Sequence, residues 1–405
     1  MTRAARNRGP LAGVRVLDFT RVVAGPYCTM LLGDFGADVV KVEEPRGGDE
    51  LRALGPPFLG DESVFFLSVN RNKRSITADL KDAAARHAVL ELVRSVDVVV
   101  ENFRPGVMQR LGLGYATLRR LNPRLIYCSV SAFDASSKYG ERPGYDLLIS
   151  GISGLQSVTG EPGRAPLRPG VNLVDLTAGS NAALGILMAL IARGNSGRGQ
   201  KVNVSLMDGA FAILGQLAAI YLNTGTVPAR RAPEDLHSQI VPYGTFMAAD
   251  GRYLNVTVPN NKFWAAFCKA IGRPAWAGDA RFADNAKRIA NRQTLIGLIV
   301  ARFAEKPRDH WISRLLAADV PAGPVNSIDE VIKDGYVEQA GMLASLVHPG
   351  CGKLRMAGIP IRMSATPGAL RLPPPMLGQH NDAVMGPARK PRAHASPVAP
   401  PLRRK

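Results

Sequence analysis

The chain has 405 residues, of which 46% are apolar and 21% are charged. This length is enough for a large core and suggests two or three domains of ~100–200 residues each. The formal net charge is +18, which points either to a solvated basic surface or to a polyanionic partner, nucleic acid or a phosphorylated cofactor. Aromatic residues are few and are not interleaved with basic runs, which argues against nucleic acid.

The four cysteines lie far apart and form no Cys-x-x-Cys pair or Cys/His cluster. A disulfide framework and a metal site are therefore not expected. The basic N-terminus is not followed by an apolar core, so it is not a secretory signal, although a short transit peptide stays an alternative. The longest apolar stretch, residues 182–192, is well short of the ~20 residues that span a bilayer. The sequence thus predicts a cytoplasmic protein with no membrane partner.

Strand and helix patterns alternate along the first half of the chain. The predicted strands lie at residues 14–19, 37–43, 96–100 and 125–130, and the predicted helices at residues 26–35 and 83–94. Repeated βαβ units imply a parallel sheet with right-handed crossovers. A long apolar helix is predicted at residues 180–193, a strand at 201–206 and a second apolar helix at 207–221.

The composition changes after this second helix. A Pro/Arg-rich linker is followed by two strand patterns around Asp250-Gly251, a hairpin signal, and by helices that contain tryptophans. This is typical of a small α+β domain, after which the chain is expected to return to the first domain. The predicted organisation is a flexible N-terminus at 1–10, a large domain at 11–226, a linker at 227–236, a small domain at 237–325, the return at 326–385 and a disordered basic tail at 386–405.

Asp175 lies in an apolar run just before the long helix pattern. It could cap the helix N-terminus, which is a common role for aspartate and the one that position alone favours. It could also be a nucleophile or base where the helix N-terminus adds positive potential. Asp146 and Glu43 are two further carboxylates in buried-looking surroundings, and each is expected to be a structural acceptor.

The turn after the first strand, residues 22–26, lacks the Gly-x-Gly-x-x-Gly fingerprint, so NAD is disfavoured despite the parallel sheet. Cations that suit phosphate are nevertheless present in Asn70-Arg-Asn-Lys-Arg74 and at Arg104 and Arg110. Ligands of open α/β sheets bind beyond the carboxyl ends of strands, which is where Asn102 lies. These side chains could therefore hold a pyrophosphate, with an ordinary basic surface as the alternative.

At this point the chain resembles the family III CoA-transferases, the group of formyl-CoA transferase and carnitine CoA-transferase. Nine motifs carry the resemblance in order over about residues 11–385: Leu11-Ala-Gly-Val-Arg-Val-Leu-Asp18 and on to Pro26, residues 32–43, Asn70-Arg-Asn-Lys-Arg-Ser-Ile76, Glu101-Asn-Phe-Arg-Pro-Gly106, Arg142-Pro-Gly-Tyr-Asp146, Asp175-Leu-Thr-Ala-Gly179, residues 197–202, residues 241–245 and Leu377-Gly-Gln-His380. The fullest likeness is to the succinyl-CoA:glutarate type, at residues 55–58, 67–73, 168–171 and 237–243.

The resemblance implies a Rossmann-like large domain built from both ends of the chain, a smaller α+β domain inserted in it, and an interlocked homodimer. It implies that Asp175 is the nucleophile, forming first a mixed anhydride and then a thioester with CoA. A CoA thioester would be a co-substrate, with no permanently bound cofactor. The residues implied at the CoA site are Val23, Ala24, Asn72, Lys73, Asn102, Phe103, Arg104 and Arg110, and those at the acyl and acceptor groups are Arg71, Arg168 and Tyr145.

Two other functions stay open. The same fold hosts α-methylacyl-CoA racemases, which use a histidine base where this chain has Tyr145, so a racemase is the alternative. A catalytically silent CoA-binding protein is the second alternative. Residues 132–140, Ala-Phe-Asp-Ala-Ser-Ser-Lys-Tyr-Gly, replace a glycine-rich loop of many relatives. This difference could shift the choice of acceptor or weaken the activity. The likeness to the succinyl-CoA:glutarate type suggests a dicarboxylate acceptor, and Arg71 or Arg168 would suit its second carboxylate.

Overall fold

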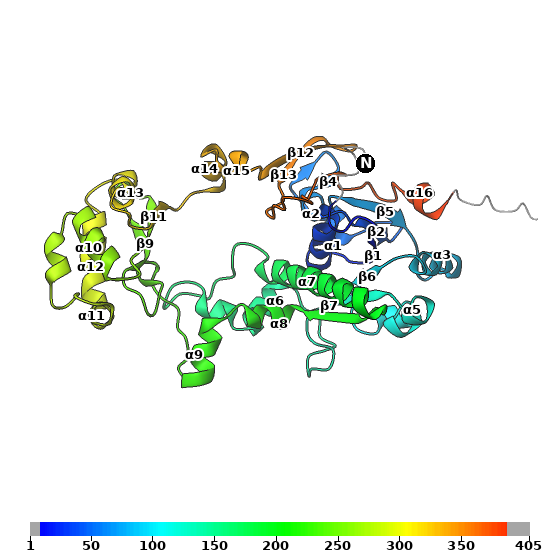
Figure 1. The fold of residues 1–405 in the computed structure, drawn as a ribbon, viewed down its shortest axis with the longest axis horizontal. Coiled ribbons are helices and arrows are strands. Elements are labelled where there is room, and N and C mark those ends of the chain that lie inside the picture. The colour runs from blue at the N-terminus through cyan, green and yellow to red at the C-terminus, as the bar shows by residue number, and fades with distance from the viewer. Residues whose placement is uncertain (1–8, 387–405) are drawn as a thin grey trace, which may run out of the picture. The chain divides into compact units, whose positions relative to one another are not determined.

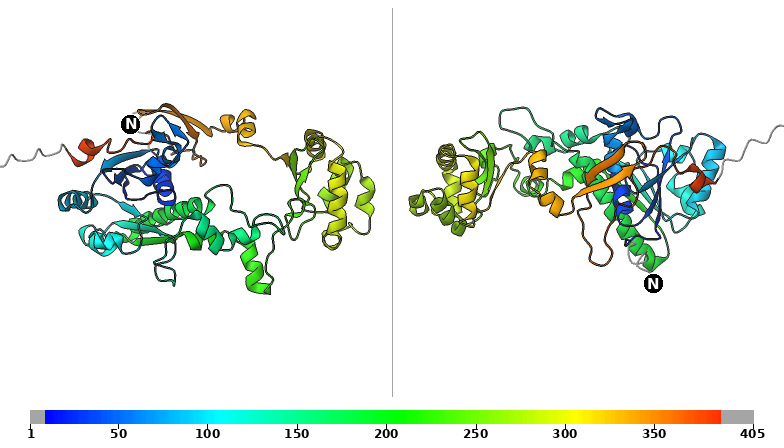
Figure 2. Two further views of the ribbon diagram at one scale, coloured as in Figure 1. Left: turned by 180° about the vertical axis from the view of Figure 1, so that it is seen from behind. Right: turned by 90° about the horizontal axis from the view of Figure 1, so that it is seen from above.

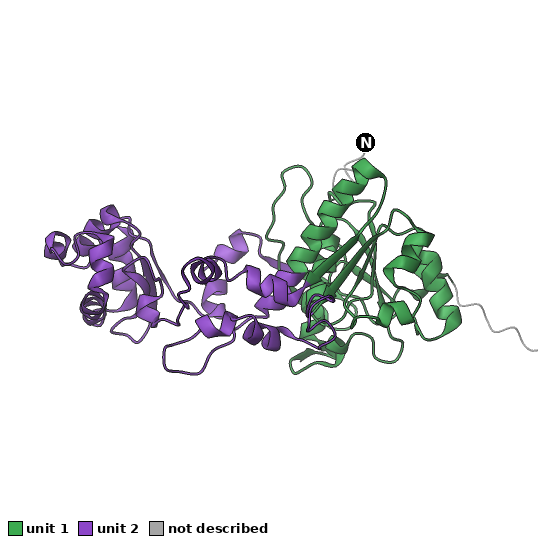
Figure 3. Cartoon of the chain, turned by 90° about the horizontal axis from the view of Figure 1, so that it is seen from below, with its two compact units in different colours: residues 1–131, 179–204, 345–405 green, residues 132–178, 205–344 purple. Residues whose placement is uncertain are grey.

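The computed structural model describes residues 9–386. The chain divides into two compact units, which Figure 3 shows in different colours. Unit 1 contains residues 1–131, 179–204 and 345–405, and unit 2 contains residues 132–178 and 205–344. The expected flexible N-terminus and basic tail lie outside the described residues, except at residues 9, 10 and 386. The domain boundaries given above stay a prediction.

A sheet of six strands in the order β5-β2-β1-β6-β7-β8 forms the centre of unit 1 (Figure 1). The pairs from β5 to β7 are parallel, and Val16 lies opposite both Val39 and Val98. The parallel α/β sheet expected from the sequence is confirmed. Its strands are β1 (Arg15–Asp18), β2 (Asp38–Glu43), β5 (Lys73–Thr77), β6 (Val98–Glu101), β7 (Ile126–Ser131) and β8 (Lys201–Ser205).

Helices cover the sheet of unit 1, which is why its central strands β1, β2 and β6 are largely apolar and buried. On one face, the core contains strand residues such as Leu17 and Val99 together with Val89 of α3 (Ala83–Val93) and Leu118 of α5 (Tyr115–Leu121). Helix α1 (Ala24–Asp34) contacts β1, β2 and β6, and α7 (Leu173–Ser196) approaches α1 closely (Figure 2). A Cβ at Gly179 of α7 would lie 2.5 Å from the carbonyl oxygen of Ala24, so this approach requires glycine.

The last described segment of the chain lies along the edge strand β5. The backbone N–H of Asn72 donates to the carbonyl of Leu372 at 2.9 Å, and that of His380 donates to Ser75 at 2.9 Å. The segment from residue 372 to residue 380 is therefore fixed by backbone hydrogen bonds to its own chain. The remaining elements with residues in unit 1 are β3 (Phe58–Leu59), β4 (Glu62–Ser63), α2 (Val64–Val69), α4 (Val107–Arg110), β12 (Leu343–His348), β13 (Gly352–Ala357) and α16 (Asn381–Met385).

Unit 2 contains a three-stranded antiparallel sheet packed on helices. Its strands are β9 (Tyr243–Met247), β10 (Tyr253–Thr257) and β11 (Ala322–Pro324), and the β9–β10 pair confirms the hairpin expected around Asp250-Gly251. Trp264 and Trp311 are among the fully buried residues of its core. The helices of unit 2 are α6 (Asp146–Ile152), α8 (Leu206–Ala212), α9 (Gln216–Thr224), α10 (Asn261–Ala270), α11 (Asn285–Ala290), α12 (Arg292–Phe303), α13 (Arg308–Leu316), α14 (Ile328–Lys333) and α15 (Tyr336–Gln339).

Two helices differ from the sequence-based expectation. The helix predicted at residues 207–221 is broken into α8 and α9, which are bent by 78°, and Gly215 between them has a φ of +50° that a right-handed helix cannot contain. Helix α7 begins at Leu173, seven residues before the predicted start at Ser180. With this extension α7 is long and apolar enough to cross a membrane, but only by length and composition, and the core helix of a soluble protein meets the same criterion.

Candidate active site

Asp175 is the third residue of α7 and is 9% exposed. The sequence placed it before the helix, which was wrong because the first intrahelical hydrogen bond already joins the N–H of Leu176 to the carbonyl of Asn172, at 3.0 Å. Asn172 thus takes the position that precedes the first helical residue. A side chain in the first turn lies where the unpaired N–H groups of the helix create positive potential, which favours a carboxylate.

Asp146, and not Asp175, caps α7. Its Oδ2 accepts the backbone N–H of Val174 at 2.9 Å and that of Asp175 at 3.3 Å. Asp146 is the first residue of α6 and is buried, so the expectation that it is a structural acceptor is confirmed. Because Asp146 satisfies the helix N–H groups, the carboxylate of Asp175 is not needed for capping.

A chain of side chains connects Asp146 back to the carboxylate of Asp175. The Nε of Arg168 donates to Asp146 Oδ1 at 2.8 Å, and a terminal guanidinium nitrogen of Arg168 donates to Asn172 Oδ1 at 2.6 Å. The amide nitrogen of Asn172 then donates to Asp175 Oδ2 at 3.4 Å, a long hydrogen bond. Arg168, expected at the acceptor group, is therefore already paired with a carboxylate of its own unit. Sequence reasoning missed Asn172, although asparagine directly before a helix is a common capping signal.

The surroundings of Asp175 make it an unusually basic carboxylate. Burial, and then the negative charge of Asp146, raise the pKa of Asp175 to about 6, while Asn172 and Arg168 act in the opposite direction. At neutral pH most of the molecules carry the ionised form, which is the nucleophilic form. A carboxylate with a raised pKa is a typical feature of a functional site.

Tyr145, the third residue expected at the acyl and acceptor groups, directly precedes α6. Tyr145 is 62% exposed. Leu147 and Leu148, which follow Asp146 in α6, are also exposed. The structure thus places Tyr145, Arg168 and Asp175 in unit 2 around the facing N-termini of α6 and α7. Arg71 lies in unit 1.

The turn between β1 and α1 carries two of the residues expected to bind CoA, Val23 and Ala24. Val23 precedes α1 and its side chain makes no capping hydrogen bond. Asn102, at the end of β6, holds the turn, because its Oδ1 accepts the N–H of Arg21 at 2.9 Å and its Nδ2 donates to the carbonyl of Arg21 at 2.8 Å. Phe103 lies beside it, with the guanidinium carbon of Arg21 4.8 Å from its ring centroid. Four expected residues therefore lie at the carboxyl ends of β1 and β6.

Arg104 and Arg110 are exposed at the start and end of the loop and short helix that follow β6. A guanidinium nitrogen of Arg110 lies 3.0 Å from the point where a Cβ would project at Gly106. Gly106 has a φ of +82°, which favours glycine. Of the three cations expected at the CoA site, Arg104 and Arg110 are exposed to solvent and Lys73 is buried.

The expected residues Arg71, Asn72 and Lys73 are buried, and their side chains bind other parts of unit 1. Arg71 forms an ion pair with Asp34 at 2.7 Å, and Asn72 donates to the same carboxylate at 2.7 Å. Lys73 forms an ion pair with Asp18 at 3.1 Å. Burial lowers the pKa of Lys73 to about 8, and Asp18 opposes this shift. The alternative that these three residues form an ordinary basic surface is therefore wrong, because Arg71, Asn72 and Lys73 are buried directly before and at the start of the edge strand β5.

Within residues 9–386, no group of three or more His, Cys, Asp or Glu side chains is placed to hold a metal ion. Unit 2 offers a buried carboxylate with a raised pKa, Asp175. Unit 1 offers a strand-end turn and exposed arginines, which are groups that suit a phosphorylated ligand.

Comparison with known proteins agrees with this chemistry. The sequence model of CoA-transferase family III matches residues 11–381. Succinyl-CoA:glutarate CoA-transferase of Mus musculus is 40% identical over 376 residues, which cover 93% of this chain and 86% of that protein. Succinate–glutarate CoA-transferase of Agrobacterium fabrum is 37% identical over 391 residues, covering 95% of this chain and 97% of that protein.

A similar structure has also been solved. The crystal structure of a CAIB/BAIF family protein from Brucella suis has a TM-score of 0.83 and 37% identity, and covers 93% of this chain and 99% of that one. The family match spans most of the chain, and both relatives are named CoA-transferases. The chain is therefore an enzyme of CoA-transferase family III.

Proposed function

We propose that this enzyme moves CoA from succinyl-CoA to a dicarboxylic acid through covalent intermediates on Asp175. The observation that carries the proposal is the buried carboxylate of Asp175 in the first turn of α7, which is free of the capping role because Asp146 accepts the helix N–H groups. Burial raises the pKa of Asp175 to about 6. A carboxylate that is both ionised at neutral pH and poorly solvated is suited to attack a carbonyl carbon.

In the first half of the reaction, one carboxylate oxygen of Asp175 attacks the thioester carbonyl of the acyl-CoA. The C–S bond breaks, CoA leaves as a thiolate, and a mixed anhydride joins Asp175 to the acyl group. The thiolate then attacks the carbonyl carbon of Asp175, the donor acid leaves as a carboxylate, and an aspartyl-CoA thioester remains. Each step exchanges one leaving group for another and needs no further reactant.

In the second half, the acceptor carboxylate attacks the aspartyl thioester and again releases the CoA thiolate. The thiolate attacks the acceptor carbonyl of the new anhydride, which forms the product thioester and restores the carboxylate of Asp175. The oxyanion at the aspartyl carbon would be stabilised by backbone N–H groups near Leu176 to Gly179, a role for which the helix start is suited.

The CoA site of the proposal consists of the residues named from the sequence. Val23, Ala24, Asn102 and Phe103 would contact CoA at the strand ends, with the ring of Phe103 packed on adenine, and Arg104 and Arg110 would bind phosphate groups. Asn72 and Lys73, whose side chains are buried, lie directly before and at the start of β5 and would support the CoA site from there. A pyrophosphate suits this set because guanidinium groups bind phosphate by charge-assisted hydrogen bonds.

The acceptor proposal is a dicarboxylate. The names of the mouse and Agrobacterium relatives both include glutarate, which supports a dicarboxylate acceptor. Arg168, Arg71 and Tyr145 are the proposed residues for the second carboxylate. Because Arg168 is bound to Asp146 and Arg71 to Asp34, either arginine would need to share or exchange its partner to meet the acceptor.

We also propose that the enzyme is an interlocked homodimer. In support, unit 2 exposes several large apolar side chains on and beside α6 and α9, and exposed apolar residues can mark an interaction surface. They include Leu147, Leu148, Ile152, Tyr221, Leu222 and Val227. Sedimentation analysis tests the proposal, and a monomer at micromolar concentration would contradict it.

The activity is tested by incubating the full chain with succinyl-CoA and a panel of mono- and dicarboxylic acids, with new CoA esters identified by mass spectrometry. We expect a dicarboxylate such as glutarate to be the best acceptor, and Asp175→Ala to abolish transfer. The matched control is Asp208→Ala, which removes an exposed carboxylate from the first turn of α8 and should leave transfer unchanged.

Other outcomes would favour the alternatives. Transfer by Asp175→Ala at the wild-type rate would remove the proposed mechanism. Deuterium exchange at the α-carbon of a 2-methylacyl-CoA without transfer would identify a racemase, and CoA binding without either reaction would identify a silent binding protein.

A further inference from the structure

Val22, in the turn between β1 and α1, has a φ of +64°. A β-branched residue in the left-handed region is a genuine outlier, because its Cβ crowds the backbone. Such conformations persist only where the surrounding structure holds them, and they concentrate at functional sites. Val22 directly precedes Val23 and Ala24, two residues of the proposed CoA site.

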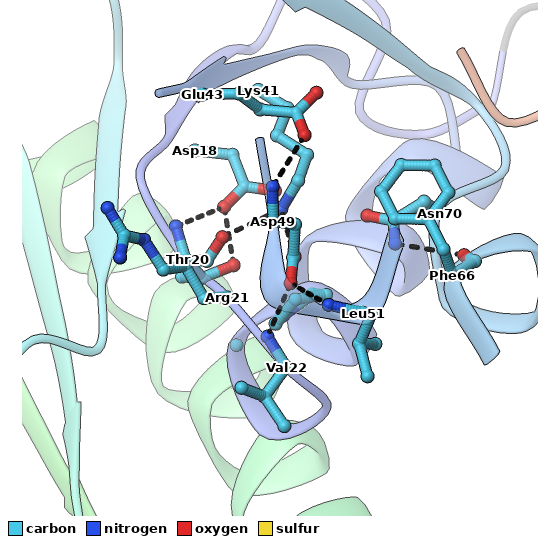
Figure 4. A network of polar contacts seen from close by, with 12 residues as sticks. Asp18, Thr20, Arg21, Val22, Lys41, Glu43, Asp49, Leu51, Phe66 and Asn70 are labelled. Atoms are coloured by element: carbon cyan, nitrogen blue, oxygen red, sulfur yellow. Dashed lines mark hydrogen bonds and ion pairs between the residues drawn. The ribbon is translucent and has the colours of Figure 1, made fainter. Parts of the chain in front are cut away.

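Asp49 holds the backbone of Val22 in this conformation (Figure 4). Its Oδ1 accepts the N–H of Val22 at 3.1 Å and, on the same oxygen, the N–H of Leu51 at 3.0 Å. Asp49 lies beyond the carboxyl end of β2 and is 1% exposed. One buried carboxylate thus joins the strained turn to the loop after the neighbouring strand.

Asp49 is itself fixed by a buried network. Its Oδ2 lies 2.8 Å from Nζ of Lys41, and both side chains are fully buried. The same Nζ donates to the carbonyl of Thr20 at 2.7 Å, two residues before Val22. The N–H of Asp49 donates to Glu43 at 3.1 Å. Lys41 and Asp49 together therefore bind the turn through two of its backbone groups, and Lys41 lowers the pKa of Asp49 against the effect of burial.

The other side of the turn is held by Asn102 through both backbone groups of Arg21. The turn is thus fixed from the ends of two different strands, β2 and β6, which flank β1 in the sheet. Helix α1 has 11 residues, and no side chain caps its start at Val23. The first N–H groups of such a helix are donors for an anionic ligand.

We propose that Asp49 is a positioning residue for coenzyme A: its hydrogen bond to Val22 holds the left-handed turn that presents the backbone of Val23 and Ala24 to the ligand. The inference rests on the proposed CoA site. Asp49 does not touch the ligand and acts only through the backbone of the turn. A merely structural aspartate would affect stability, whereas a positioning aspartate affects affinity through the conformation of residue 22.

Glycine at position 22 distinguishes these roles, because glycine adopts a positive φ without a steric penalty. Coenzyme A binding to the full chain is measured by isothermal titration calorimetry for the wild type, Asp49→Ala, Val22→Gly and the double variant. We expect Asp49→Ala to weaken binding by about tenfold, the effect of one lost hydrogen bond that fixes a binding conformation. The double variant should regain at least about threefold of this loss, because residue 22 no longer needs to be held.

Asp97→Ala is the matched control. Asp97 likewise accepts a backbone N–H, that of Arg15 at 2.9 Å, and pairs with one cation, Arg193 at 2.9 Å, but at the amino ends of the strands. It should bind CoA as the wild type does. If Asp49→Ala does not fold, Asp49→Leu combined with Lys41→Met, with and without Val22→Gly, provides the same comparison, because this pair removes the acceptor of the Val22 N–H and leaves no buried lysine without its partner.

The outcomes separate the inference from the function on which it rests. A double variant that binds no better than Asp49→Ala, or an Asp49→Ala variant with wild-type affinity, overturns the role of Asp49 while the wild type still binds CoA. A wild type that binds no coenzyme A overturns the proposed function, and the inference with it. The proposal is supported if Val22→Gly increases the affinity for coenzyme A in the Asp49→Ala variant but not in the wild type.

Discussion

The carboxylate of Asp146 accepts the backbone N–H of Asp175 at 3.3 Å, and with the same oxygen the N–H of Val174 at 2.9 Å. Two acidic residues therefore share the N-terminus of α7 and divide its roles. Asp146 satisfies the helix backbone and is compensated by Arg168 at 2.8 Å. Asp175 accepts only a long hydrogen bond from Asn172, at 3.4 Å, so its negative charge is less neutralised than that of Asp146. The Asp146 carboxylate is one cause of the raised pKa of Asp175.

This division predicts opposite effects for two neighbouring substitutions. Asp146→Asn keeps an oxygen for the helix N–H groups but removes a negative charge, so the pKa of Asp175 should fall. Arg168→Gln removes a positive charge, so that pKa should rise. The acid limb of the pH profile of kcat/KM measures both changes. If the acid limbs of the Asp146→Asn and Arg168→Gln variants shifted in the same direction, the electrostatic account would be contradicted.

The wild-type pH profile is a second prediction. Asp175 must be ionised to attack, and burial raises its pKa to about 6. We therefore expect kcat/KM for succinyl-CoA to be constant at neutral pH and to fall about tenfold per pH unit below about pH 6. The control is unfolding monitored over the same range, since loss of the fold would imitate the limb. A profile that is flat down to pH 4 would contradict the assignment.

The raised pKa also predicts a gain in stability when the nucleophile is neutralised. Because the folded pKa of Asp175 lies above its ordinary value of 3.8, ionisation favours the unfolded chain, and the cost is fully present above about pH 6 and absent below 3.8. Asp175→Asn should therefore increase the free energy of unfolding by roughly 1–3 kcal/mol at pH 8, with no gain at low pH. Urea unfolding at both pH values measures it, and a destabilised variant at pH 8 would contradict it.

Arg71 and Arg74 form a matched pair for the buried ion pairs of unit 1. Arg71 binds Asp34 with both side chains almost fully buried, whereas Arg74 binds Asp38 with 25% and 44% of the side chains exposed. Arg71→Met leaves Asp34 without its cation and should cost about 3–5 kcal/mol of stability. Arg74→Met should cost no more than about 1 kcal/mol. An Arg71→Met variant of wild-type stability would contradict this structural role. A raised KM for the acceptor in that variant would then leave only the proposed role of Arg71 in binding the acceptor carboxylate.

Two glycines of α7 test the packing of this helix. A Cβ at Gly179 would lie 2.5 Å from a backbone oxygen of α1, whereas nothing lies within 4 Å of one at Gly194. Gly179→Ala should destabilise the protein by about 1–3 kcal/mol through overpacking. Gly194→Ala should stabilise it by up to about 1 kcal/mol, because alanine favours a helix. Thermal unfolding measures both, and equal effects would contradict the close approach of α7 and α1.

Much of the sheet was predictable because its signals are local. Strands β1, β2, β6 and β7 are largely buried, and each contains at least two consecutive apolar residues that are buried. The family followed from motifs spread over the whole chain, and the family match confirms that assignment. The chemistry on Asp175 stays a prediction.

The errors arose where distant residues decide the structure. The burial of Arg71 and Lys73 was not foreseen, because their partners, Asp34 and Asp18, lie 37 and 55 residues away in the sequence. The start of α7 was placed too late because Asp175 resembled a cap, while the actual cap, Asp146, comes from another helix, 29 residues earlier. Capping and ion pairing between separate segments leave no periodic pattern in the sequence.

The central claim is that the acyl group and CoA pass over the side chain of Asp175. The most direct measurement is to incubate the enzyme with succinyl-CoA, add hydroxylamine, digest the chain and locate the modified residue by mass spectrometry. An activated aspartyl ester or thioester reacts with hydroxylamine, whereas a free carboxylate does not, so a hydroxamate is predicted at Asp175 and only after addition of succinyl-CoA. An unmodified Asp175 in an enzyme that still turns over succinyl-CoA would contradict the account.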